Sequence, residues 1–324
     1  MKAITVQTDK SLAWEEVSPP TPGKNDVLVN VRAAGINRAD LAQRAGSYPP
    51  PAGASEILGL EVSGEIAELG EEVTGWKKGD RVCALLTGGG YAEQVAVSAP
   101  LLMPIPEGWS FEEAGGMPEV FFTAFLNLFM EGGLRAGETA LIHGGASGVG
   151  TAGIQLAKAA GCRVFTTAGT AKKVEVCSQL GADLAVNYRE DDFAERIKEV
   201  TNEENGGVDV VLDMVGANYL ARNIDLLNLN GRLVFIATLS GKEGEIDIRK
   251  LMGKRLTLKG STLRSRPLEE KKEIKEAFMA QFWSKLEAGE IKPVIHEVFA
   301  IQDVEQAHKV MRANKNIGKL ILRV

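Results

Sequence analysis

The sequence of 324 residues predicts an α/β protein in which a β-rich domain is joined to a doubly wound parallel sheet of the Rossmann type. Three observations support this prediction. Short segments of alternating polarity, separated by Pro, Gly, Asn and Asp turns, fill the chain up to about Pro118. Strand patterns alternate with helix patterns from about Glu119 to Thr262, and a glycine-rich turn joins the first such strand to its helix.

The β-rich region is expected to form a compact antiparallel or barrel-like domain. Its predicted strands are Ala3–Gln7, Val27–Ala33, Ser63–Leu69, Arg81–Leu85 and Ala92–Val97. The stretch LLMPIPEGWS then predicts an extended exit, and a helical pattern begins at Phe111.

The stretch TALIHGGASGVGTAGIQLAKAAG, Thr139–Gly161, predicts the first strand, turn and helix of the parallel sheet. Its turn, Gly145–Gly150, reads GASGVG, so Ser147 occupies the middle glycine position of a GxGxxG motif. Glycines let the backbone approach a pyrophosphate, and the amides of a helix N-terminus favour an anion. Such turns also occur for structural reasons alone, so the rest of the chain must support the interpretation.

Six strands with crossover helices are expected in this second region. The predicted strands are Thr139–Ile142, Arg163–Thr167, Leu184–Asn187, Val208–Asp213, Arg232–Ala237 and Leu256–Gly260. The later helices are predicted at Lys172–Leu180, Asp192–Val200 and Tyr219–Leu229. The tail predicts a charged helix from Pro267 to Ala288, a helix near Val304–Ala313 and a strand, Lys319–Val324. Because six strands already complete the parallel sheet, this tail is expected to return to the first domain.

Composition and charge narrow the classes of function. A net charge of −6 argues against general binding of polyanions, although a local basic cleft stays open. The three cysteines, Cys83, Cys162 and Cys177, are far apart, which indicates a reducing cytosol without a disulfide framework. The first residues lack the apolar core of a signal peptide, and no apolar run approaches the length of a membrane span. We therefore expect a cytoplasmic protein without a membrane segment.

The residues beyond the glycine turn bear on the choice of cofactor. Sites of this kind usually place Asp or Glu at the end of the second strand, to bind the ribose 2′-hydroxyl of NAD. That position falls in Thr166–Thr170, which contains no acid, and Lys172 and Lys173 follow, with Tyr188 at the end of the third strand. Cations in place of a carboxylate favour a 2′-phosphate and hence NADPH. Alternatively, the lysines are solvated at a helix start, where basic residues oppose the helix dipole.

The order of elements and several motifs resemble the zinc-free quinone oxidoreductases of the medium-chain dehydrogenase/reductase superfamily. The motifs are GINRADLAQRAGSYPPPAGASEILGLEVSGEI (Gly35–Ile66), GDRVCALLTGGGYAEQ, LMPIPEG, PEVFFTAF, the glycine turn, NYRE at Asn187, LDMVG at Leu212, GSTLRSR at Gly260 and ANKNIGK at Ala313. The NRAD and YPPPAGAS segments most resemble the tumour-suppressor-inducible branch of animals. The resemblance implies a GroES-like catalytic domain of residues 1–120 and 265–324, an NADPH-binding Rossmann domain of residues 121–264, and a homodimer through the nucleotide domains.

The same resemblance implies which residues form the site. Asn37, Tyr48 and Thr123 are expected near the nicotinamide, with Thr123 at the start of a helix. Asn37 and Tyr48 are candidates for positioning the reactants, and Tyr48 is also a candidate proton donor; no firm acid or base is evident. The other residues that match cofactor-contacting positions of the family are Lys173, Tyr188, Leu263, Arg264, Ser265 and Asn316.

Position in the predicted sheet adds further cofactor-binding candidates. Ser147, Gly148, Val149 and Gly150 are expected to line the pyrophosphate, and Met214 and Ile236 follow strand ends, where parallel sheets present ligands. Structural interpretations stay open for several candidates: Tyr48 as a loop aromatic, Thr123 as a helix residue, Arg264 as a solvated charge, and Met214 and Ile236 as core. His143 is expected to be a hydrogen-bonded structural residue, and Phe121, Phe122, Phe125 and Phe129 to be helix core.

A metal site is not expected. Zinc-dependent relatives carry Cys where this sequence has Asn37, and His before Glu where it has Leu60-Glu61; their four-cysteine lobe is also missing. Glu61 is therefore expected to serve structure.

The leading hypothesis is NADPH-dependent reduction of quinones, particularly ortho-quinones or conjugated dicarbonyls, because aromatisation drives hydride addition and positioning then suffices. The alternative reaction is reduction of the C=C bond of 2-alkenals or enones, which needs a proton from Tyr48 or solvent. A different class is a structural or RNA-binding protein that binds NADPH, since zinc-free relatives have been recruited to such roles. The net charge and the lack of a basic stripe with exposed aromatics make nucleic acid an unfavoured partner.

Overall fold

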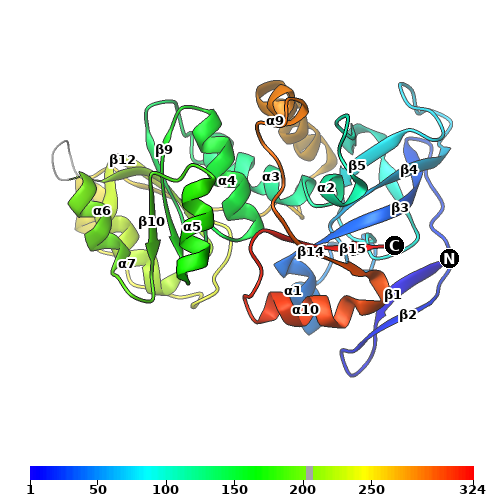
Figure 1. Ribbon diagram of the computed structural model, residues 1–324, viewed down its shortest axis with the longest axis horizontal. Helices are drawn as coiled ribbons and strands as arrows, with labels where there is room; N and C mark the ends of the chain where they lie inside the picture. The colour runs from blue at the N-terminus through cyan, green and yellow to red at the C-terminus, as the bar shows by residue number, and fades with distance from the viewer. Residues whose placement is uncertain (202–206) are drawn as a thin grey trace. The chain divides into compact units, whose positions relative to one another are not determined.

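The computed structural model describes residues 1–201 and 207–324, which form two compact units (Figure 1). Unit 1 contains Met1–Phe122 and Leu263–Val324, and unit 2 contains Thr123–Thr262. Unit 1 is therefore assembled from both ends of the chain. No helix among the described residues is long and apolar enough to cross a membrane.

Unit 2 is built on a six-stranded parallel sheet, which confirms the predicted doubly wound sheet. Its strands are β8 (Thr139–Ile142), β9 (Arg163–Ala168), β10 (Leu184–Asn187), β11 (Val208–Asp213), β12 (Leu227–Phe235) and β13 (Thr257–Gly260). The spatial order is β10-β9-β8-β11-β12-β13. The chain runs outward from β8 to β10 and then crosses back to β11, so the order reverses between β8 and β11. Ligands bind outside the carboxyl ends of the strands at such a reversal.

Helices lie on both faces of this sheet, and Figure 1 shows β9 and β10 between α4 and α5 on one side and α6 and α7 on the other. The helices after the first strand are α4 (Gly148–Ala159), α5 (Ala171–Gln179), α6 (Phe193–Thr201), α7 (Ala217–Leu226) and α8 (Ile248–Gly253). Apolar side chains from the sheet, such as Leu141 and Val211, pack against Phe193 and Ile224 of the helices. Periodicity predicted these helices, except for the short α8.

Two predicted boundaries near this sheet are wrong. The helix expected to end at Leu229 already ends at Leu226, because Leu227 enters β12 beside Val208 of β11 and is buried there. Thr123 does not begin a helix: α3 runs from Pro118 to Phe125 and continues as the π-helical turn η2 (Leu126–Glu131). Pro118 suits the first turn of a helix because its missing N–H would be unpaired there, so α3 begins five residues before Thr123.

Unit 1 is built on a seven-stranded sheet in the order β14-β15-β3-β4-β5-β7, with β6 also paired to β3. The strands are β3 (Asp26–Ile36), β4 (Glu61–Leu69), β5 (Arg81–Leu85), β6 (Gln94–Ser98), β7 (Leu102–Pro104), β14 (Ile295–Ala300) and β15 (Lys319–Arg323). The pairs are antiparallel except β14 with β15. A separate antiparallel pair joins β1 (Lys2–Val6) and β2 (Leu12–Glu16).

The helices of unit 1 close its core. They are α1 (Arg38–Ala45), α2 (Phe111–Gly115), α9 (Leu268–Glu287) and α10 (Val304–Arg312), with 3-10 turns at η1 (Ala99–Leu101) and η3 (Ile301–Asp303). The sequence did not predict β2 or α1. Helix α9 buries one side chain per turn, and its Phe278 makes edge contacts with Phe121 and Phe122. Both of these aromatics are core residues, as expected.

Candidate active site

The glycine turn of unit 2 shows why a serine replaces the middle glycine. Ser147 is the N-cap of α4, and its Oγ accepts a hydrogen bond of 3.0 Å from the amide of Gly150. Serine is among the preferred N-cap residues because its hydroxyl satisfies an otherwise unpaired amide. A Cβ on Gly150 would lie 2.3 Å from the carbonyl oxygen of Gly144, so only glycine allows the helix to start this close to the turn. The Ser147 hydroxyl is thus used within the protein and also approaches Sδ of Met214 at 3.8 Å.

The amides that remain at this helix start are those of Gly148 and Val149. Neither donates in any hydrogen bond described for residues 1–201 and 207–324. Unsatisfied amides at the positive end of a helix dipole form an anion site. The turn lies at the carboxyl end of β8, next to the reversal of strand order. This geometry can bind a pyrophosphate through the backbone.

The carboxyl ends of β9 and β10 bring the next candidates to one edge of the sheet. Lys173 is half-buried in the first turn of α5, and Tyr188 follows β10 with 43% of its surface exposed. The Tyr188 ring lies against Gly169, where a Cβ would be 2.6 Å from the phenol oxygen. No acid stands at this edge directly after β9, since Gly169 and Thr170 follow the strand. A phenol and a cation thus occupy the place where an NAD-binding carboxylate would be expected.

Met214 and Ile236 directly follow β11 and β12, and both are half-buried. The Met214 sulfur packs over Gly144, where a Cβ would approach it to 2.8 Å. His143, in contrast, is a structural residue, as expected. Its ring nitrogens contact Thr167 Oγ1 at 3.1 Å and Asn223 Oδ1 at 2.8 Å, and burial lowers its pKa to about 4.

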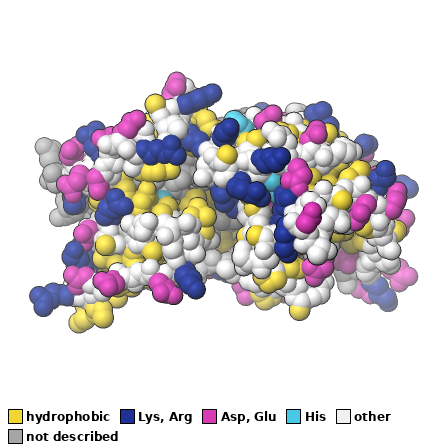
Figure 2. All heavy atoms as spheres, turned by 90° about the horizontal axis from the view of Figure 1, so that it is seen from below, with side chains coloured by type: hydrophobic (Ala, Val, Ile, Leu, Met, Phe, Trp, Pro, Cys, Tyr) yellow, Lys and Arg dark blue, Asp and Glu magenta, His cyan; other side chains and the backbone are white. Residues whose placement is uncertain are grey.

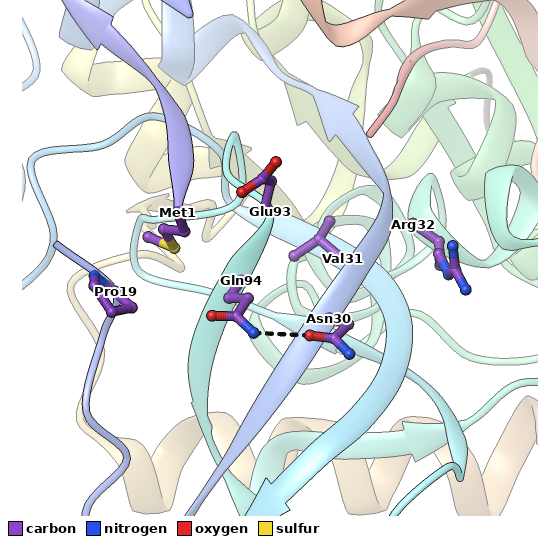
Figure 3. A pocket seen from close by; sticks show the side chains of 7 residues that line it. All are labelled: Met1, Pro19, Asn30, Val31, Arg32, Glu93 and Gln94. Carbon is purple, nitrogen blue, oxygen red and sulfur yellow. Dashed lines mark hydrogen bonds between the residues drawn. The ribbon is translucent and has the colours of Figure 1, made fainter. Parts of the chain in front are cut away.

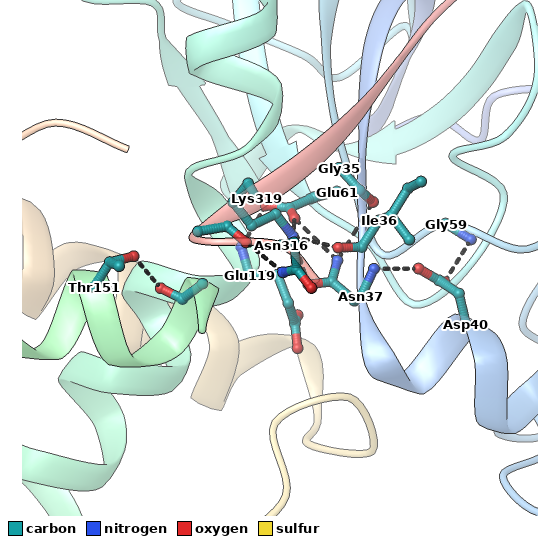
Figure 4. A network of polar contacts seen from close by, with 12 residues as sticks. Gly35, Ile36, Asn37, Asp40, Gly59, Glu61, Glu119, Thr151, Asn316 and Lys319 are labelled. Carbon is teal, nitrogen blue, oxygen red and sulfur yellow. Dashed lines mark hydrogen bonds and ion pairs between the residues drawn. The ribbon is translucent and has the colours of Figure 1, made fainter. Parts of the chain in front are cut away.

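Unit 1 contains a buried polar network centred on an ion pair (Figure 4). Nζ of Lys319 lies 2.6 Å from Oε1 of Glu61, and the two side chains are only 3% and 0% exposed. The same ammonium donates to the Ile36 carbonyl and to Oδ1 of Asn37, each at 2.7 Å. Nδ2 of Asn37 donates to Glu61 Oε1 at 2.9 Å. The Asn37 amide is therefore fixed from both sides, and it joins β3, β4 and β15.

The backbone is shaped to receive this carboxylate. A Cβ on Gly35 would lie 2.2 Å from Oε1 of Glu61, so glycine is required beside the buried pair. The amide of Glu119, in the first turn of α3, donates to Oε2 of Glu61 at 2.9 Å. Burial of its carboxyl group, with the nearby Glu61 carboxylate, raises the pKa of Glu119 to about 8. The Glu119 carboxyl is then mainly protonated at neutral pH, while Glu61 is held by Lys319.

A second buried chain of polar groups adjoins the network. Oδ2 of Asp40 accepts from the backbone N–H of Asn37 at 2.7 Å and from the Tyr91 hydroxyl at 3.0 Å, and that hydroxyl lies 3.4 Å from Nε2 of His308. Burial raises the pKa of Asp40 to about 6 and lowers that of His308 to about 3. These groups tie α1 to α10 through the core of unit 1.

The remaining candidates of unit 1 are divided between buried and exposed positions. Leu263 and Arg264 are buried, Asn316 is half-buried and bonds the Gly318 carbonyl at 2.7 Å, and Ser265 is exposed. Tyr48 is half-buried, with the Arg264 guanidinium 5.4 Å from its ring centroid. Arg264 is therefore not a solvated loop charge. Thr123, the first residue of unit 2, is half-buried within α3.

One pocket of unit 1 is lined by none of the residues that the sequence predicts for the active site. It measures about 470 Å³ and is lined by Asn30, Arg32 and Gln94 among others (Figure 3). Two of its polar side chains bond each other, since Nε2 of Gln94 donates to Oδ1 of Asn30 at 2.9 Å, whereas Arg32 donates to Glu65. We assign no chemistry to it.

The described residues do not fit a catalytic zinc ion. No three His, Cys, Asp or Glu side chains converge to hold a metal within residues 1–201 and 207–324. Asn37 offers an amide that is already bonded, and Leu60, before Glu61, is buried in the core. Zinc requires Cys, His or carboxylate ligands in tetrahedral geometry.

Sequence reasoning missed three residues of unit 1. Lys319 precedes an apolar strand and looks like an exposed end, Lys271 lies in a highly charged helix, and Glu119 lies within PEVFFTAF without a distinguishing pattern. The only available signal was that Lys319 and Glu119 fall within motifs of the family.

A six-stranded Rossmann sheet with an open helix start, joined to a second β-rich unit, is typical of oxidoreductases that bind a dinucleotide. Comparisons identify the family. Residues 23–107 match the alcohol dehydrogenase GroES-like domain, and residues 148–282 match the zinc-binding dehydrogenase family. The chain belongs to the medium-chain dehydrogenase/reductase superfamily.

Individual relatives agree with this assignment. A quinone oxidoreductase of Sus scrofa is 34% identical over 311 residues, covering 95% of this chain and 92% of the relative. The quinone oxidoreductase of Thermus thermophilus, whose structures include a complex with NADPH, has a TM-score of 0.85 and 32% identity, with 100% of both chains covered. The CurK enoyl reductase has a TM-score of 0.86 and 30% identity, covering 99% of this chain and 98% of its own.

Proposed function

We propose that this protein reduces quinones, particularly ortho-quinones or conjugated dicarbonyls, with NADPH and without a metal. The observation that carries the choice of NADPH is the edge of the sheet beyond β9, where Lys173 and Tyr188 stand and the usual carboxylate is missing. A cation and a phenol are suited to a 2′-phosphate, which carries negative charge and several acceptor oxygens. Named quinone oxidoreductases among the relatives support the acceptor class.

The chain's own residues would bind and orient the reactants. The amides of Gly148 and Val149 would hold the pyrophosphate, and Lys173 with Tyr188 would hold the 2′-phosphate. When bound, NADPH supplies the hydride. The Asn37, Glu61 and Lys319 network would keep the backbone of β3 and β15 rigid beside the acceptor, so that positioning provides most of the rate enhancement.

The test is to follow NADPH absorbance with a panel of para- and ortho-quinones and with diketones. We expect turnover clearly above the rate with NADPH alone, and lower kcat/KM with NADH. No turnover with any quinone would refute the proposal.

A second candidate is reduction of the C=C bond of enones or 2-alkenals, supported by the similarity to an enoyl reductase. Burial raises the pKa of the Tyr48 phenol, and the nearby Glu119 raises it further, whereas Arg264 lowers it. Tyr48 therefore stays protonated at neutral pH. It would then be available to donate a proton to the α-carbon. Higher kcat/KM for an alkenal than for every quinone would favour this reaction, and Tyr48→Phe should slow it more than it slows quinone reduction.

The structural or RNA-binding role has less support. Acidic and basic side chains are interspersed on the face shown in Figure 2, and the net charge is −6. RNA binding favours a continuous basic surface with exposed aromatics. A salt-dependent shift of labelled RNA at low micromolar protein would support RNA binding.

We also propose a cytoplasmic homodimer that associates through its nucleotide domains, with residues 121–264 as the cofactor domain and residues 1–120 with 265–324 as the catalytic domain. Support for the interface comes from exposed apolar side chains in unit 2, including Leu239 (59%), Ile248 (65%) and Met252 (72%). Exposed apolar patches often mark protein interfaces. Light scattering should give twice the mass of one chain, and Ile248→Lys should shift it toward the monomer.

A further inference from the structure

Unit 1 contains a cavity of about 670 Å³, and two of the expected cofactor-contacting residues, Arg264 and Ser265, are in its lining. It lies between the loop Pro51–Ile57, the segment Leu85–Gly89 after β5, strand β6 and the first turn of α9. Its volume is within the range of pockets that hold small organic ligands.

The lining of this cavity combines apolar and cationic side chains. Val95, Val97 and Leu101 are among the apolar ones, and Arg264 and Lys271 are among the cationic ones. None of the residues described as lining the cavity is Asp or Glu. Arg266 also lines it, but its guanidinium is 3.1 Å from Glu270 and is already neutralised.

Arg264 is held by hydrogen bonds to neutral groups, and no ion pair to it is described within residues 1–201 and 207–324. Its side chain is only 3% exposed; Nε donates to the Thr87 carbonyl at 2.8 Å and Nη2 to Oε1 of Gln43 at 2.7 Å. Nη1 is buried and has no hydrogen-bond partner. A buried cation without a counter-charge is costly, and an anion beside it removes that cost.

Lys271 adds a second buried cation. It is 4% exposed, and its Nζ donates to the Arg264 carbonyl at 2.7 Å and to Thr87 Oγ1 at 3.1 Å. An ammonium has three donors, so one remains. Burial and the neighbouring Arg264 lower the pKa of Lys271, while Glu119 opposes the shift. Because the Glu119 carboxyl has a pKa of about 8, it is mainly protonated at neutral pH and leaves this part of the lining positive.

We propose that this cavity binds an apolar monocarboxylic acid, with the carboxylate at Arg264 and Lys271 and the hydrocarbon chain along Val95, Val97 and Leu101. The Arg264 guanidinium also lies against the Tyr48 ring. The bound acid therefore competes with an acceptor that Tyr48 helps to position. The binding itself does not depend on the proposed reaction, whereas the competition rests on it.

The first test compares decanoate, decanol and decylamine by calorimetry on the full chain. We expect decanoate to bind at least about tenfold more tightly than decanol, because a hydrogen bond between charged groups is stronger than one to a neutral hydroxyl, and decylamine to bind most weakly. Shortening the acid from decanoate to octanoate should weaken binding by about threefold to fourfold for each CH₂ removed. Equal affinity for acid and alcohol would refute the proposal, whatever the enzyme reduces.

The second test uses a matched pair of variants on α9. Lys271→Met, which keeps an unbranched side chain one atom shorter and removes the ammonium, should weaken decanoate binding at least about tenfold. Lys272→Met is the control, because Lys272 pairs with Glu269 at 3.8 Å and does not line the cavity. Equal effects of both variants would contradict the assignment. Should Lys271→Met fail to fold, the comparison of the three ligands on the unaltered protein still decides.

The link to Tyr48 is tested separately by steady-state kinetics. Decanoate should be a competitive inhibitor against the quinone. If decanoate binds tightly but inhibits purely noncompetitively, the proposed competition with the quinone is refuted, whereas the proposed binding site is not. A protein that binds decanoate yet reduces no quinone would refute the proposed function alone.

Discussion

The buried ion pair between Lys319 and Glu61 gives the most direct test of the structure of unit 1. Lys319→Met removes the ammonium and leaves the Glu61 carboxylate, which is 0% exposed, with only the amides of Asn37 and Glu119 as partners. Breaking a buried pair by removing one partner costs about 3–5 kcal/mol, because an uncompensated charge stays in the core. We expect the free energy of unfolding, measured by urea denaturation at pH 7, to fall by this amount.

The same strand supplies the control. Arg323, also on β15, pairs with Glu112 at 2.7 Å, but its side chain is 64% exposed. Arg323→Met should therefore cost about 0.2–1 kcal/mol, as exposed pairs do. Adding Glu61→Gln to Lys319→Met removes the stranded charge, and the double-mutant cycle should show a coupling energy of about 1–3 kcal/mol. The reasoning is refuted if Lys319→Met costs no more than Arg323→Met and the cycle is additive.

Three other predictions concern the cofactor, pH and metal. Lys173→Ala should raise KM for NADPH about tenfold with little effect on NADH, while Lys172→Ala changes neither; equal effects on both cofactors would show that Lys173 does not contact the phosphate. The pKa of Glu119 rises from 4.5 to about 8 on folding, so the folded state holds this proton more tightly than the unfolded state. The stability that proton binding to Glu119 contributes is therefore complete below pH 4.5 and is lost as the pH rises through 8. Unfolding free energy should fall by about 1–2 kcal/mol between pH 6 and 9 after allowance for solvent screening, and Glu119→Gln should remove this slope; an unchanged slope would exclude Glu119 as its source. Chelators should leave quinone reduction intact, whereas loss of activity that zinc restores would contradict the metal-free interpretation.

The parallel sheet of unit 2 was predictable because each strand is a short apolar run between turn residues, as in Val208–Asp213, whose bounds agree with β11. Local pattern was sufficient there. It failed at α3, where a π-turn follows the helix, and at Leu227, which leaves a helical pattern to pair with β11.

The buried network of unit 1 could not be predicted for a different reason. Asn37, Glu61 and Lys319 belong to three strand regions that become neighbours only when the sheet forms. Each residue alone has the polarity of a surface position. Only tertiary pairing reveals that their charges and amide groups satisfy one another, which is also why the cationic lining of the cavity was not foreseen from the charged sequence of α9.

The position of β15 between β14 and β3 has a consequence for biosynthesis. The sheet of unit 1 cannot close until the ribosome has released Lys319–Arg323, whereas all strands of unit 2 precede Leu263. Until then Glu61 has no ammonium partner from β15, and the Ala33–Ile36 part of β3 lacks its neighbouring strand. Unit 2 can therefore fold during translation, while the N-terminal part of unit 1 must wait for β15.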